Sequence, residues 1–220
     1  MKTIVVFGDS LTWGYDPAND QLPPGSKVRR FSDEQRWPGV MLRELGDGYR
    51  IIVEGLVGRT TVWDDPLEPG RSGAAHLIPI LDSQSPLDLV IIMLGTSDLQ
   101  KHLGVSARDI ARGAGILVDQ ALHNAAGDFV GLPKVLLVSP PHLGEHVTEL
   151  VQSPDFGGGL AKSMKLAEQF QITANRYGVP FFDAATVAEP SETDQVHLDV
   201  EQHANLGRAI APLVRAMLAD

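Results

Sequence analysis

The sequence has no cysteine among its 220 residues. Disulfide bonds, cysteine nucleophiles and cysteine-ligated zinc or iron–sulfur sites are therefore excluded. Basic residues are also scarce beside acidic ones, with 18 Lys and Arg against 28 Asp and Glu and a formal net charge of −10. Because such a surface repels phosphate backbones and anionic membranes, neither nucleic acid nor a membrane is an expected partner.

Long hydrophobic runs are missing as well. No stretch approaches the roughly 20 apolar residues needed to cross a bilayer. The apolar run at residues 4–7 is too short for the core of a signal peptide, which predicts a cytoplasmic protein. Hydrophobic residues make up 43% of the chain and charged residues 21%, as in soluble globular proteins. We expect a single domain over residues 1–220, because no repeat or linker divides the chain.

Short apolar runs and amphipathic stretches alternate along the chain, and this alternation indicates the fold class. The runs do not alternate apolar with polar residues, which is typical of parallel strands buried on both faces. The predicted strands are residues 3–7, 50–54, 87–94, 134–139 and 179–182. Helical spacing of apolar residues occurs at 37–45, 110–122, 160–172 and 206–217. Together they predict a three-layer α/β/α sandwich around a five-stranded parallel sheet, a flavodoxin-like arrangement.

Ligands of such folds bind beyond the carboxyl ends of the strands, and a candidate nucleophile lies there. Ser10 follows the first strand within the motif Gly-Asp-Ser-Leu at residues 8–11. If a helix begins at this point, the backbone N–H groups near Ser10 favour negative charge and one of them can bind an oxyanion. The alternative is an ordinary turn in which Ser10 caps the helix.

A candidate base lies near the other end, where Asp194 precedes His197 by three residues. A histidine can take the proton of a serine, and a carboxylate can fix the tautomer of that histidine. The alternative is a surface turn that happens to contain a histidine. Two long polar loops, residues 16–35 and 140–159, are expected to form the walls of the site, or else to be plain surface excursions.

Taken together, the motifs resemble those of the SGNH or GDSL hydrolase family. Gly-Asp-Ser-Leu at 8–11 and Asp-x-x-His at 194–197 match its first and last blocks. The segment 54–61 contains Gly58 at the position of the family's glycine, and Gly-Thr-Ser-Asp at 95–98 stands for the block usually read Gly-x-Asn-Asp. The blocks occur in family order, so the resemblance covers nearly the whole chain.

The resemblance implies a serine hydrolase with Ser10 as nucleophile, His197 as base and Asp194 as its orienting partner. It implies an oxyanion hole built from Ser10, Gly58 and the third-block residue, which is Ser97 here instead of asparagine. Ser97 has a shorter arm, so it donates directly, donates through a water, or leaves only backbone donors. Losing one such donor costs roughly 10²–10³ in turnover, so reduced but real activity is expected.

Several stretches resemble bacterial aryl esterase/acyltransferases and carbohydrate acetylesterases in particular, among them Arg-Thr-Thr at 59–61 and 86–95. This likeness implies small ester substrates and a homo-oligomer. Trp13 either lines the acyl pocket or belongs to the core, and Arg59 and Asp65 are candidates for a structural pair. No cofactor is needed, and no metal is expected because no His-Glu-x-x-His pattern occurs.

Two other functions remain open. A sugar acetylesterase would use the same reacting residues on a different leaving group. A non-catalytic ligand-binding α/β module with a decayed site is also compatible with Ser97, although Ser10, Asp194 and His197 are all present.

Overall fold

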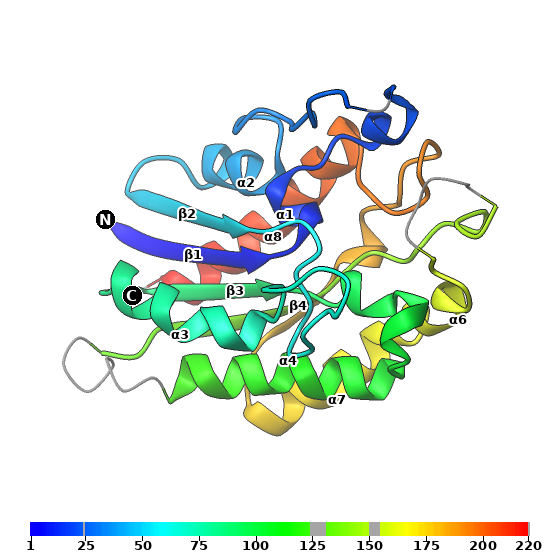
Figure 1. The fold of residues 1–220 in the computed structure, drawn as a ribbon. Helices are drawn as coiled ribbons and strands as arrows, with labels where there is room; N and C mark the ends of the chain where they lie inside the picture. The colour runs from blue at the N-terminus through cyan, green and yellow to red at the C-terminus, as the bar shows by residue number, and fades with distance from the viewer. Residues whose placement is uncertain (24, 124–130, 150–154, 220) are drawn as a thin grey trace.

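A computed structural model describes residues 1–23, 25–123, 131–149 and 155–219 (Figure 1). Five strands form one parallel sheet in the order β2-β1-β3-β4-β5. The strands are β1 (Lys2–Gly8), β2 (Tyr49–Gly55), β3 (Leu89–Met93), β4 (Lys134–Ser139) and β5 (Phe181–Asp183). Each coincides with a predicted apolar run, so the predicted parallel sheet is confirmed.

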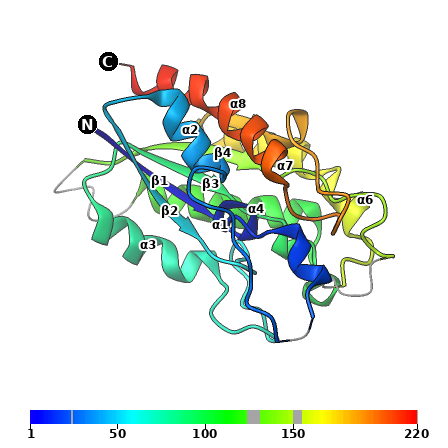
Figure 2. The same cartoon turned by 90° about the horizontal axis from the view of Figure 1, so that it is seen from above.

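Helices cover both faces of the sheet (Figures 1 and 2). One face packs against α2 (Trp37–Leu45) and α8 (Val200–Leu218). The other packs against α3 (Gly73–Gln84), α4 (Ala107–Leu122) and α7 (Leu166–Tyr177). Along β1, Ile4 and Val6 belong to the first core and Val5 and Phe7 to the second. Because these side chains on both faces of β1 are fully buried, residues 4–7 of the strand form an unbroken apolar run.

Two helical details differ from the sequence expectation. Helix α3 had not been predicted, since it buries only a narrow stripe through Leu77 and Leu81 and contains Pro79. The stripe at 160–172 is divided between α6 (Gly159–Ser163) and α7. The chain turns at Met164 between these helices, which leaves that side chain 62% exposed.

The loops at the carboxyl edge of the sheet are short helical turns and extended segments. They include α1 (Ser10–Trp13) after β1, and the 3-10 turns η1 (Pro17–Gln21), η2 (Ser97–Leu99), η3 (Lys101–Leu103) and η4 (Ala184–Thr186). Part of the predicted 140–159 loop, residues 150–154, lies outside the described residues. Over the described ranges, no helix combines the length and apolar character needed to cross a membrane.

Candidate active site

Ser10 occupies a tight turn between β1 and α1. The carboxylate of Asp9 accepts a hydrogen bond from the backbone N–H of Leu11 at 3.0 Å and so caps the short helix. Gly8 permits the turn, because a Cβ there would lie 2.1 Å from Oγ1 of Thr12 and 2.9 Å from the carbonyl oxygen of Met93. The turn presents Ser10 with only 5% of its surface exposed.

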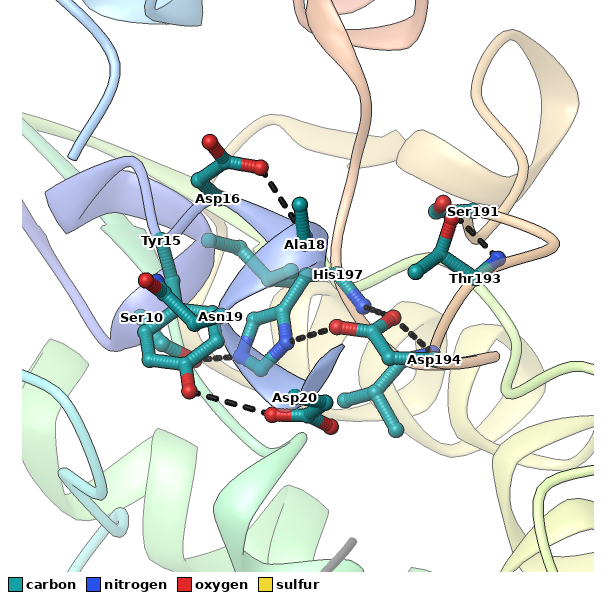
Figure 3. A network of polar contacts seen from close by, with 12 residues as sticks. Ser10, Tyr15, Asp16, Ala18, Asn19, Asp20, Ser191, Thr193, Asp194 and His197 are labelled. Carbon is teal, nitrogen blue, oxygen red and sulfur yellow. Dashed lines mark hydrogen bonds and ion pairs between the residues drawn. The ribbon is translucent and has the colours of Figure 1, made fainter. Parts of the chain in front are cut away.

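The three side chains predicted to react lie together, as Figure 3 shows. Nε2 of His197 is 2.9 Å from Oγ of Ser10, across a sequence separation of 187 residues. Nδ1 of the same ring is 2.6 Å from Oδ2 of Asp194. This geometry allows a proton to pass from the hydroxyl to the imidazole while the carboxylate holds the ring in one orientation.

Asp194 is buried and fully engaged in its own loop. Its Oδ1 accepts hydrogen bonds from the backbone N–H groups of Val196 (3.0 Å) and His197 (2.9 Å). Burial acts to raise the pKa of Asp194, but the hydrogen bonds from His197 and the two amides outweigh it and hold the pKa below its usual value. The carboxyl group therefore stays an anion beside the ring.

Tyr15 is a further residue of the site, which the sequence analysis had missed. Its ring stacks on the imidazole of His197, with the centroids 4.2 Å apart. Its hydroxyl donates to Oδ1 of Asp20, in the turn η1 (Figure 3). The predicted 16–35 loop thus does reach the site, through Asp20. The sequence did contain a signal for this role, because Tyr15 is an aromatic residue only five positions after Ser10, just beyond the end of α1.

The expectation that Trp13 lines the pocket is corrected by the structure. The guanidinium of Arg30 lies 4.6 Å from the centroid of the Trp13 ring, and the same side chain donates to the backbone carbonyl of Trp13 at 2.7 Å. Residues of a one-turn helix point in different directions, so Trp13 faces Arg30. Tyr15 lines the cavity instead.

A cavity of about 210 Å³ lies over Ser10 and His197. Gly58 and Ser97, both predicted for the oxyanion hole, are in its lining. Gly58 has a φ of +77°, a left-handed conformation that disfavours other residues at this position. The rest of the lining is mixed in character and consists of Tyr15, Asp20, Val57, Glu68, Thr96, Gln100, Phe156 and Val196.

A buried polar contact joins two segments that adjoin residues of the cavity lining. Oδ1 of Asp98 accepts from the backbone N–H of Thr61 at 3.0 Å and from its hydroxyl at 2.6 Å. This contact ties η2, which begins at Ser97, to the segment that follows Gly58. Burial raises the pKa of Asp98 to about 7 and that of Asp9 to about 6. No local sequence pattern pointed to Thr61 as the partner of Asp98.

The suggested pair of Arg59 and Asp65 does not form. The guanidinium carbon of Arg59 lies 4.2 Å from the centroid of the Phe7 ring. The guanidinium group also donates to the backbone carbonyls of Gly8 and Glu54. Asp65 instead pairs with His102, with 2.9 Å between Oδ1 and Nε2. Arg59 therefore supports the strand ends beneath the site, while Asp65 ties together two surface loops.

Comparison with known proteins identifies the family of the chain. The chain matches the GDSL-like lipase/acylhydrolase family over residues 6–205. The protein belongs to this family. A search of curated proteins finds no match.

Several solved structures are similar to this GDSL-like protein over nearly its whole length. The M. smegmatis aryl esterase is 40% identical, with a TM-score of 0.89 over 99% of this chain and 100% of that one. A carbohydrate acetylesterase from Sinorhizobium meliloti is also 40% identical, with a TM-score of 0.88 and the same coverage. A lipase/acylhydrolase from Enterococcus faecalis, 17% identical with a TM-score of 0.69 over 100% of this chain and 98% of that one, shares the fold.

Proposed function

We propose that the protein hydrolyses small esters of short-chain acids by way of a covalent acyl-enzyme on Ser10. The observation that carries this proposal is the continuous hydrogen-bonded relay from Ser10 through His197 to Asp194. Membership of an acylhydrolase family and the likeness to an aryl esterase support the same reaction class. The reaction needs no cofactor.

In the first half of the reaction, Oγ of Ser10 attacks the ester carbonyl carbon while Nε2 of His197 takes its proton. Asp194 stabilises the imidazolium that forms. The carbonyl oxygen, now an oxyanion, rests against the backbone N–H groups of Ser10 and Gly58, with the hydroxyl of Ser97 as a third donor. When the C–O bond breaks, His197 returns its proton to the leaving alcohol.

In the second half, water attacks the acyl-enzyme and His197 again accepts and returns the proton, which releases the acid and restores Ser10. An alcohol in place of water would instead yield a new ester, so acyl transfer is part of the proposal. The cavity volume of about 210 Å³ favours acetyl and similarly short acyl groups. The predicted cytoplasmic location and homo-oligomeric state stay predictions.

The test uses p-nitrophenyl acetate and a fluorophosphonate probe, which labels only an activated serine. The unmodified protein is expected to hydrolyse the ester and to be labelled, whereas Ser10→Ala should do neither. Turnover that persists in Ser10→Ala would remove Ser10 from the mechanism. Absence of both turnover and labelling in the unmodified protein would favour the non-catalytic binding module.

A sugar acetylesterase is the second candidate, and the polar side chains in the cavity wall favour it. Asp20, Glu68 and Gln100 line the cavity, and their carboxylate and amide oxygens can accept hydrogen bonds from sugar hydroxyls. The S. meliloti neighbour is named a carbohydrate acetylesterase. Comparison of kcat/KM for acetylated sugars and for p-nitrophenyl esters of rising chain length would separate the two substrate classes.

A further inference from the structure

Gln195, between Asp194 and His197, has an unusual backbone conformation. Its φ is +62°, and among the residues that the structure describes it is the one non-glycine residue with a positive φ. Glycine adopts this left-handed region without penalty, whereas a residue with a Cβ does so at a cost in free energy. Other interactions must therefore hold Gln195 in place.

Its side chain supplies such interactions. Oε1 of Gln195 accepts from the backbone N–H of His146 at 3.1 Å. Nε2 donates to the backbone carbonyl and to the carboxylate of Glu192, at 3.3 and 3.2 Å. The backbone takes part as well, because the carbonyl oxygen of Gln195 accepts from Gly144 N–H at 2.8 Å. With only 5% of its surface exposed, Gln195 joins the segment 144–146 to the loop that contains Asp194 and His197.

Gly144 and Gln195 are also matched in shape. A Cβ on Gly144 would lie 2.0 Å from Oε1 of Gln195 and 2.6 Å from its Cδ, and the three atoms nearest to that position all belong to Gln195. The segment that carries Gly144 is itself anchored, since the side chains of Leu143 and Val147 are buried in the core. Gln195 is thus clamped against a fixed support.

We infer that Gln195 is a positioning residue, which sets the orientation of Asp194 and His197 by clamping their loop to residues 144–146. This inference rests on the proposed function. His197 has to lie within hydrogen-bond reach of Ser10, although no helix or strand contains it. A displacement of about 1 Å in such a geometry can cost roughly 10²-fold in rate, so a clamp adjacent to both residues acts directly on turnover.

The first variant is Gln195→Gly, which removes the side-chain contacts of the clamp and also the backbone strain. A positioning role predicts that kcat for p-nitrophenyl acetate falls at least tenfold while KM changes less than twofold. If Gln195 only filled space in a strained turn, relief of that strain would leave kcat unchanged. Measurements are made well below the melting temperature, so that loss of folded protein does not contribute.

The second variant, Gly144→Ala, perturbs the same contact from the other side. It should lower both kcat and the melting temperature, because the new methyl group displaces the Gln195 side chain. In the double variant Gly144→Ala/Gln195→Gly that side chain is absent, so kcat and melting temperature should be no lower than in Gln195→Gly alone. Gly157→Ala in the same loop is the control, since its Cβ would meet only Asp155 and Lys101 side-chain atoms, at 3.0 Å or more.

The outcomes separate this inference from the proposed function. An active unmodified protein together with full kcat in Gln195→Gly would overturn the positioning role and leave the function of Ser10 intact. Additive losses in the double variant would overturn the clamp, since they would show that Gly144 acts elsewhere. An unmodified protein that is neither active nor labelled by fluorophosphonate would refute the proposed function and the positioning role with it.

Discussion

Two regions of the molecule meet at the hydrogen bond between Ser10 and His197, and they are built differently. The nucleophile turn, residues 8–15, continues a central strand and closes on itself through backbone contacts to Asp9 and Ser10. The base loop, residues 191–199, precedes α8 and contains neither helix nor strand. Its shape depends on hydrogen bonds to Asp194 and to the neighbouring segment 144–146.

The difference shows how one reaction centre can combine local and long-range order. The register of β1 between β2 and β3 fixes the nucleophile turn, so it requires little beyond the sheet itself. The base loop has no such frame and uses buried polar side chains instead. Apart from loss of His197 itself, substitutions in the base loop should therefore change the rate in graded steps, whereas the nucleophile turn should respond mainly to loss of Ser10.

The largest effect is expected from removal of the base itself. His197→Ala leaves Ser10 without a proton acceptor, so kcat for p-nitrophenyl acetate should fall by about 10⁴ or more. Asp194→Asn should lower it less, because the ring remains present but loses its anionic partner. The comparison uses purified variants with matched circular dichroism spectra. Retention of more than a few per cent of kcat in His197→Ala would assign the base to another group.

The sequence predicted the nucleophile turn more completely than the base loop, for a physical reason. Ser10 follows an apolar run and precedes a turn, so short-range patterns are enough to place it. Asp194 and His197 were found because the carboxylate and the imidazole are three residues apart. The role of Gln195 depends on Gly144, about fifty residues earlier in the chain, and a contact of this kind leaves no local pattern.

Other differences between the sequence prediction and the structure also arise where local patterns carry no information. Tyr15 reaches His197 only because α1 ends after a single turn, and this length decides that Trp13 faces Arg30 instead. The contact of Asp98 with Thr61 joins the segments that follow β3 and β2, two strands that are separated by β1 in the sheet. Apolar periodicity gave the strands and the longer helices, but not α3, whose buried stripe is narrow.

Outside both regions, the position of Ser97 allows an oxyanion donor with a longer arm to be introduced. Ser97 lies in the cavity lining after β3, where the family block normally has asparagine. Ser97→Asn should raise kcat for a small ester by up to about tenfold, because the asparagine amide donates to the oxyanion from a longer arm than the serine hydroxyl does. Steady-state kinetics with p-nitrophenyl acetate provide the measurement. An unchanged or lower kcat would count against an oxyanion role for this position.

The third prediction concerns the buried carboxyl group of the nucleophile turn. Burial raises the pKa of Asp9 to about 6, above its value in the unfolded chain. Between about pH 4 and pH 6 the folded state therefore binds more protons, so its free energy of unfolding falls as the pH rises. Asp9→Asn removes this contribution, and its stability relative to the unmodified protein should improve from pH 4 to pH 7, by on the order of 2 kcal/mol.

Urea unfolding at several pH values measures that difference. Since Oδ1 of Asp9 accepts from Leu11 and the amide oxygen of asparagine can do the same, the variant should keep the turn. A constant loss of stability added to the pH-dependent difference is compatible with the prediction, because only the slope of that difference against pH reports the titration of Asp9. A difference between the two proteins that stays flat across this range would contradict it.

The smallest effect is expected at the contact that joins the two regions, where the ring of Tyr15 from the nucleophile turn stacks on His197 from the base loop. Tyr15→Phe keeps the ring and removes only the hydrogen bond to Asp20, so kcat should change less than twofold. Tyr15→Leu removes the aromatic face that favours the imidazolium, and an aromatic contact worth about 1 kcal/mol corresponds to roughly fivefold in kcat. Equal losses in both variants would show that the hydroxyl, and not the ring, supports the base.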